Sequence, residues 1–265
     1  MDSNGLFLIG LGPGDLELMT QHAINVLRNM DKRYLEGYTA TLPNDQERKL
    51  EQIVGPWERV MRPQIEDGEE ILEEAGCKNV AIMVVGDPMQ ATTHVDLIVR
   101  AKERGTPVTV VPGISAVSLA VTSSGLQSYR FGRQVTLPYA YGNYLPTSPL
   151  RYILDNQSRN LHTLVLLDLD PTGLGIEKPI HMSPAIAGQI LQQMSEKWNE
   201  DNEEVNVGTW DVIVLSDLGT AQNRVYSTTI AELEGMDDGR VHCLILPSGM
   251  DNHERIVFDD MRFLT

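Results

Sequence analysis

Short apolar runs alternate with helical patterns through the first 112 residues. The apolar runs predict strands at residues 6–9, 80–85 and 108–111. The second run contains no polar residue, which is typical of a strand buried on both faces of a parallel sheet. Thr20 and Thr93 each precede apolar residues at helical spacing, so they predict two capped helices, the second ending near Gly105. Strands that alternate with helices predict an α/β sheet built from crossover units.

The second half of the chain contains more strands, again with helices between them. We predict strands at 134–138, 162–168, 212–216, 225–228 and 242–246, and helices at 116–123, 150–156 and 185–196. Residues 197–206 are acidic and are expected to be mobile. A boundary at Pro112-Gly113 divides the chain into two α/β domains, 1–112 and 113–265. We expect a small ligand to bind in a cleft between them.

Composition and charge narrow the classes of function. The 265 residues are 42% hydrophobic and 22% charged, and no run is long and apolar enough for a membrane span. Only two cysteines occur, and the chain starts without a signal peptide, so we expect a cytoplasmic protein without disulfides. The net charge of -16 argues against nucleic acid as a partner. Because only six of the 21 basic residues are lysines, we also consider adaptation to a high-salt cytoplasm.

Three glycine-containing turns are the candidates for binding chemistry: Gly10–Asp15, Gly86–His94 and Val111–Ala116. The first is not a dinucleotide fingerprint, because its third glycine is one position early and Pro13 lacks a backbone N–H. Asp87 in the second turn has two interpretations, a hydrogen-bond acceptor for a ligand or an organiser of the turn. For each of the three turns, the residues alone leave open whether it binds a ligand or only shapes the backbone.

Other reactive side chains give no further signal. The histidines are scattered without metal-ligand spacing, and no serine lies in a nucleophile elbow. We therefore predict no metal site and identify no catalytic base.

The three turns resemble the signature loops of the tetrapyrrole methylase superfamily. Further blocks resemble the diphthine synthase family, the archaeal and eukaryotic methyltransferases of diphthamide biosynthesis, within that superfamily. These blocks are Tyr34–Thr39, Gly86–His94, Gly125–Gly132, Gly142–Ser148 and Leu161–Leu164. Pro13 and the segment Gly113–Ala116 depart from the diphthine synthase pattern and are closer to the tetrapyrrole-modifying relatives.

The resemblance implies an enzyme that uses S-adenosylmethionine, bound in a cleft between two α/β domains, and releases S-adenosylhomocysteine. It implies methylation of the amino group of the amino-carboxypropyl histidine of translation elongation factor 2, giving diphthine, by a homodimer. The implied cofactor contacts are Pro13, Asp87, Gln90, Ser115, Ala116, Leu167, Leu218 and His242. Two alternatives stay open: a precorrin or uroporphyrinogen methyltransferase, and a non-catalytic S-adenosylmethionine-binding protein.

Overall fold

The computed structural model describes residues 4–142, 144–236 and 239–262. Two compact units share these residues. The first unit comprises the chain up to Ala116 together with the segments Leu174–Pro179 and Gly219–Ala221, and the second unit comprises the rest. The sequence did not predict that two short segments of the second half pack with the first unit.

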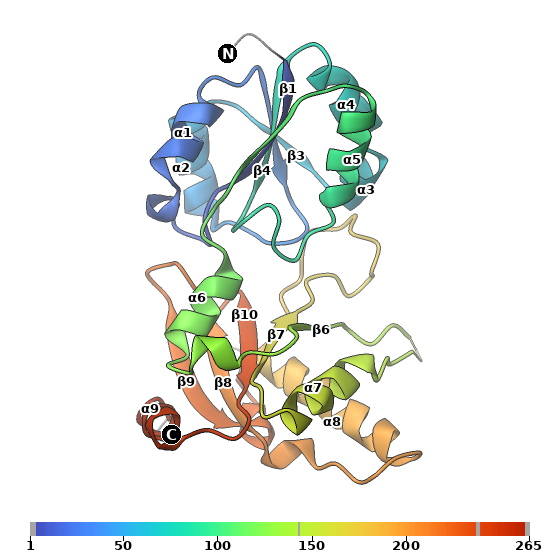
Figure 1. Cartoon of the computed structure of the whole chain (residues 1–265), viewed down its shortest axis with the longest axis vertical. Coiled ribbons are helices and arrows are strands. Elements are labelled where there is room, and N and C mark those ends of the chain that lie inside the picture. Colours follow the sequence, from blue (N-terminus) through green and yellow to red (C-terminus); the bar gives the residue numbers. More distant parts are fainter. Residues whose placement is uncertain (1–3, 143, 237–238, 263–265) are drawn as a thin grey trace. The chain divides into compact units, whose positions relative to one another are not determined.

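The first unit is built on a five-stranded parallel sheet, as the alternating pattern predicts (Figure 1). Its strand order is β3-β2-β4-β1-β5. The strands are β1 (Gly5–Gly10), β2 (Lys32–Glu36), β3 (Glu58–Val60), β4 (Asn79–Val84) and β5 (Val108–Val111). Strand β1 is buried along its whole length, and the central strand β4 along all but its first residue, which explains their apolar composition.

Helices cover both faces of this sheet. One face packs against α1 (Gln21–Leu27) and α2 (Asn44–Val54), and the other against α3 (Arg62–Asp67), α4 (Glu69–Ala75) and α5 (Val95–Glu103) (Figure 1). Thr20 caps α1 as predicted, because its hydroxyl accepts a hydrogen bond from the backbone N–H of Ala23. The prediction that Thr93 caps α5 is wrong. His94 is the N-cap residue, and its ring bonds back into the preceding loop instead of to the helix.

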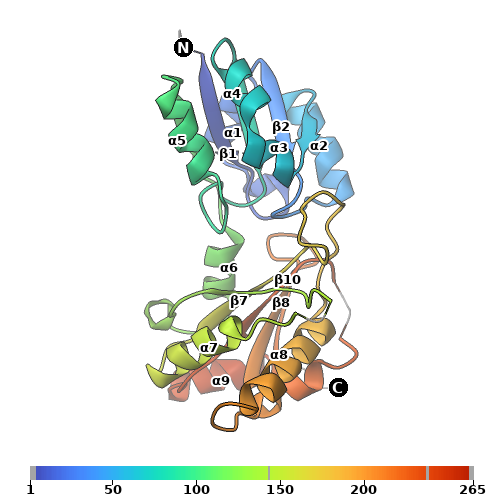
Figure 2. The same ribbon diagram turned by 90° about the vertical axis from the view of Figure 1, so that its right-hand side faces the viewer.

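The second unit has a mixed five-stranded sheet in the order β6-β7-β10-β8-β9. Its strands are β6 (Val135–Leu137), β7 (Thr163–Leu167), β8 (Asp211–Ser216), β9 (Arg224–Thr229) and β10 (His242–Leu246). Strands β6 and β7 are parallel, and the other neighbours are antiparallel. On one face lie α7 (Ser148–Ser158) and α8 (Pro184–Asn199), and on the other α6 (Ala116–Ser123) and α9 (Asn252–Asp260) (Figure 2).

The expectation of a mobile stretch at residues 197–206 is wrong for its beginning. Helix α8 continues to Asn199, whose side chain exchanges two hydrogen bonds with the backbone of Val205 at 2.8 and 3.0 Å. The acidic residues between them therefore form a loop that is closed at its base.

In the part of the chain that the structure describes, no helix combines the length and hydropathy needed to cross a bilayer. The same residues contain no group of three or more histidine, cysteine, aspartate or glutamate side chains able to hold a metal ion.

Candidate functional site

The three glycine-containing turns lie together at the carboxyl edge of the first sheet. Strands β1, β4 and β5 run parallel and end at Gly10, Val84 and Val111, and each turn continues directly from one of them. Loops at the carboxyl ends of the strands are where open α/β sheets bind ligands.

These turns are packed backbone against backbone. Gly12 and Gly86 exchange two N–H···O bonds, of 3.2 and 2.7 Å. A Cβ atom on Gly10 would lie 2.5 Å from the nitrogen of Gly113, and a Cβ on Gly113 would lie 2.2 Å from the carbonyl oxygen of Gly86. Only glycine permits such contacts, so the glycines join the three turns into one surface.

Asp87 fastens two of the turns to each other. Its Oδ1 accepts the backbone N–H of Met89 at 2.9 Å, and its Oδ2 accepts the backbone N–H of Gly113 at 3.1 Å. The interpretation of Asp87 as an organiser of the turn is therefore correct, and its role extends to the neighbouring turn. An ionised carboxylate has about four acceptor positions, so Asp87 keeps capacity for a ligand.

The other predicted contacts of the first unit lie on the same turns. Gln90 is exposed, two residues after the buried Pro88. Pro13 is half-buried against Gly219: a Cβ on that glycine would lie 2.4 Å from Cγ of Pro13. Ser115 is buried and Ala116 is exposed where the third turn enters α6.

The remaining predicted contacts share one edge of the second sheet. Strand β7 ends at Leu167 and β10, antiparallel to it, begins at His242, so the two residues lie at the same end of the strands. Ser216, the last residue of β8, pairs with His242, and its hydroxyl lies 2.8 Å from Nδ1 of that histidine. Leu218 follows two residues later. Leu167, Leu218 and His242 are each at most 8% exposed.

A buried polar cluster beside the second turn was not predicted. Glu36 is the last residue of β2, and its Oε2 lies 3.7 Å from Nε2 of His94. Burial raises the pKa of Glu36, an effect that hydrogen bonds from Thr39 partly offset. Sequence reasoning treated His94 as one of several scattered histidines. A glutamate directly after Tyr34 and Leu35, inside the block Tyr34–Thr39, was the available signal.

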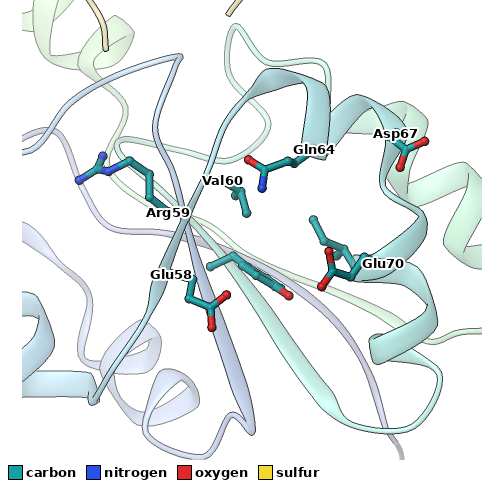
Figure 3. A pocket seen from close by; sticks show the side chains of 8 residues that line it. Glu58, Arg59, Val60, Gln64, Asp67 and Glu70 are labelled. Carbon is teal, nitrogen blue, oxygen red and sulfur yellow. The ribbon is translucent and has the colours of Figure 1, made fainter. Parts of the chain in front are cut away.

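A pocket of about 110 Å³ opens on the first unit, away from the three turns (Figure 3). It lies between β2, β3, α3 and α4, and is lined by Tyr34, Glu58, Arg59, Val60, Gln64, Asp67, Glu70 and Ile71. None of the predicted contacts lies in it. Its three acidic side chains make it a poor site for a ligand that carries a carboxylate.

Comparisons with known proteins agree with this geometry. The family model for Tetrapyrrole (Corrin/Porphyrin) Methylases matches residues 5–234. A diphthine synthase from Methanoregula boonei is 33% identical over 253 residues, which cover 94% of this chain and 96% of that protein. A diphthine methyl ester synthase from Eremothecium gossypii is 35% identical, covering 94% of this chain and 86% of the relative. A crystal structure from Entamoeba histolytica, of a protein proposed to be a diphthine synthase, matches with a TM-score of 0.87 and 29% identity. That match covers 99% of this chain and the whole of the other.

The chain therefore belongs to the tetrapyrrole methylase family, whose members generally use S-adenosylmethionine. Its relatives within the family are diphthine synthases and diphthine methyl ester synthases, which makes it a methyltransferase of diphthamide biosynthesis. They do not favour the precorrin methyltransferase or the non-catalytic binding protein.

Proposed function

We propose that the protein methylates the amino group of the amino-carboxypropyl histidine on translation elongation factor 2. In this proposal the joined turns of the first unit bind S-adenosylmethionine. The observation that supports it is the convergence of three turns, through the Gly12–Gly86 bonds and the bonds of Asp87, at the carboxyl edge of a parallel sheet. The contacts at Leu167, Leu218 and His242, the homodimer and the cytoplasmic location remain expectations from the resemblance.

The residues of the turns fit this ligand. A Cβ on Gly86 would enter open space, so the glycine leaves room for a ligand to approach the backbone. Met89 is 37% exposed and offers apolar surface beside the polar side chain of Gln90. A nucleoside needs such a combination of apolar walls and a few polar groups.

The chain's own task is then positioning. S-adenosylmethionine supplies the methyl group on a sulfonium that leaves readily. The protein must hold the acceptor amine in line with that methyl group and exclude water. The acidic chain would favour encounter with a basic surface on the acceptor protein, because complementary charges accelerate association.

The test incubates the protein with methyl-labelled S-adenosylmethionine and elongation factor 2 that carries the amino-carboxypropyl histidine. We expect label on the factor and none on a factor with unmodified histidine. Label on a tetrapyrrole but not on the factor would transfer the function to tetrapyrrole synthesis. Stoichiometric binding without transfer to either acceptor would support the non-catalytic alternative.

The relatives are named after two different products, diphthine and diphthine methyl ester, so the proposal must also state which product this protein forms. Diphthine contains only N-linked methyl groups, whereas its methyl ester also contains a methyl on the carboxylate. Mild alkali hydrolyses an ester and leaves an N-methyl group in place. Intact-mass measurement before and after alkali treatment therefore distinguishes the two products, and we expect a product whose mass does not change.

Asp87→Ala is the matching test of the binding site. The variant loses the bonds to Met89 and Gly113, so we expect the dissociation constant for S-adenosylmethionine to rise at least about tenfold in calorimetry. Asp31→Ala is a matched control, because Asp31 also accepts a backbone N–H, that of Asn79, but at the amino edge of the same sheet. An unchanged affinity in Asp87→Ala would remove Asp87 from the site.

A further inference from the structure

Three buried polar side chains form a cluster at the end of the Gly86–His94 turn: His94 itself and two residues at or just after the end of β2. His94, Glu36 and Tyr38 are 0%, 2% and 7% exposed. Within the described residues, Nε2 of His94 has no hydrogen-bond partner. Burying a polar atom without a partner costs free energy, so such an arrangement needs an explanation.

The hydrogen-bond roles fix the position of one hydrogen in the pair formed by Glu36 and His94. Nδ1 of His94 lies 2.8 Å from the carbonyl oxygen of Pro88, which can only accept, so Nδ1 carries a hydrogen. The carboxylate of Glu36 accepts the backbone N–H and the hydroxyl of Thr39, at 2.9 and 2.6 Å. Nε2 of His94 therefore presents a lone pair to the Glu36 carboxylate at 3.7 Å, an unfavourable arrangement that a proton on the glutamate relieves.

A continuous series of bonds leads from this pair to the candidate site. His94 holds the carbonyl oxygen of Pro88, which also accepts the hydroxyl of Thr92 at 2.7 Å. The N–H of the same peptide group, that of Met89, donates to Oδ1 of Asp87, whose Oδ2 holds Gly113. One peptide plane is thus fixed at both ends, and its orientation sets the orientation of Asp87.

We propose that Glu36 and His94 are a positioning pair, which orients the Pro88–Met89 peptide and through it Asp87, and so determines the affinity for S-adenosylmethionine. The inference rests on the proposed function. Two charged groups of α3 act on the neighbouring Tyr38: the Arg62 guanidinium lies 5.4 Å from the centre of its ring, and Glu66 raises its pKa. The raised pKa of Glu36 agrees with a pair that retains a proton.

The experiment compares His94→Ala with His94→Asn by calorimetric titration of S-adenosylmethionine. The alanine loses one of the two donors to the carbonyl oxygen of Pro88, and we expect about a tenfold rise in the dissociation constant. The asparagine amide can replace Nδ1–H, so we expect it to restore most of the affinity. In steady-state kinetics His94→Ala should raise KM for S-adenosylmethionine with kcat nearly unchanged, which a general loss of folded protein would not produce. His253→Asn, at an exposed position, is the control.

A pH profile tests the glutamate. As the pH rises, the wild-type affinity should fall more steeply than that of Glu36→Gln, because only the wild-type carboxyl can lose a proton. The amino group of the ligand titrates equally in both, so the difference between the two profiles is the measurement.

Identical profiles, or a His94→Ala variant that binds like the wild type, would overturn the positioning pair and leave the proposed function intact. If His94→Ala does not fold, the comparison of the pH profiles of the wild type and Glu36→Gln decides whether the positioning pair exists. A wild-type protein that does not bind S-adenosylmethionine would instead refute the proposed function.

Discussion

Each unit of the chain contains a buried histidine–glutamate pair, and the two pairs differ in how completely their hydrogen bonds are satisfied. In the second unit, Nε2 of His162 lies 3.1 Å from Oε1 of Glu254, and its Nδ1 accepts the backbone N–H of Ser248 at 3.0 Å. Both ring nitrogens therefore have partners, and the imidazole is neutral with its hydrogen on Nε2. In the first unit, His94 has one partner, and its second nitrogen faces Glu36 at 3.7 Å.

The satisfied pair belongs to a larger structural network. Glu254 also accepts the guanidinium of Arg130 at 2.6 Å and the backbone N–H groups of Gln127 and Asp251. Arg130 in turn donates to three backbone carbonyl oxygens. The block Gly125–Gly132, which distinguishes the diphthine synthase pattern, thus holds α9 against the rest of the second unit. The comparison indicates that the complete network supports the fold, whereas the incomplete pair is available to act on a loop.

The largest effect that separates the two pairs is expected for Glu254→Ala. The variant leaves Arg130, whose side chain is only 16% exposed, without its carboxylate, and leaves two backbone N–H groups without an acceptor. Removing one partner of a buried ion pair typically costs about 3–5 kcal/mol, so we expect a loss of that size in the free energy of unfolding by urea. Asp211→Ala removes the carboxylate of an exposed pair with Arg255 and should cost less than about 1 kcal/mol. Equal costs for the two variants would show that the network is no anchor.

The second prediction concerns pH, because the two glutamates should respond in opposite directions. Burial alone would raise the pKa of Glu254, but hydrogen bonds from the backbones of Gln127 and Asp251 and from His162 lower it. The pKa of His162 is also lowered, in its case by burial. A group with a lowered pKa stabilises the fold fully above its unfolded value, about 4.3 for glutamate and 6.5 for histidine, and loses this effect as the pH falls.

Glu36 has a raised pKa, so its contribution is complete below about pH 4.3 and declines as the pH rises through the folded value. Urea unfolding between pH 2 and 8 should therefore show an acid loss whose part below about pH 4.3 is reduced in Glu254→Gln. Glu36→Gln should leave the acid loss in place. An acid loss that Glu254→Gln leaves unchanged would contradict the assignment.

Much of the fold was predictable because its central strands are apolar without interruption. The runs that became β1, β4, β5 and β10 were placed to within one residue, and α6 was placed with its observed bounds. Strand β2 was missed because Lys32 and Arg33 begin it and Glu36 ends it, a pattern without apolar continuity. The helices α2, α3, α4 and α9 were missed for a related reason: their exposed faces are rich in charge and short apolar stripes face the core.

The site was predictable to a smaller extent. Glycine spacing indicated three turns, and a parallel sheet brings its strand ends together, so the location followed from the sequence. The roles of single side chains did not follow. Whether Asp87 binds a neighbouring turn, and whether His94 faces a glutamate from β2, depends on contacts between residues 26 and 58 positions apart. Periodicity and spacing contain no information about such pairs.

The smallest expected effect, that of Glu36→Gln on stability, is also the most direct test of the comparison. An amide of the same shape can still accept the N–H of Thr39, and its own N–H can donate to Nε2 of a neutral His94. Every polar atom of the pair then has a partner without an extra proton. We therefore expect the free energy of unfolding at pH 7 to change by less than about 1 kcal/mol, and the difference from the wild type to shift in favour of the variant as the pH rises. A loss of about 3 kcal/mol or more, as for Glu254→Ala, would mean that both pairs are anchors of the same kind, and the distinction drawn from their hydrogen bonds would fail.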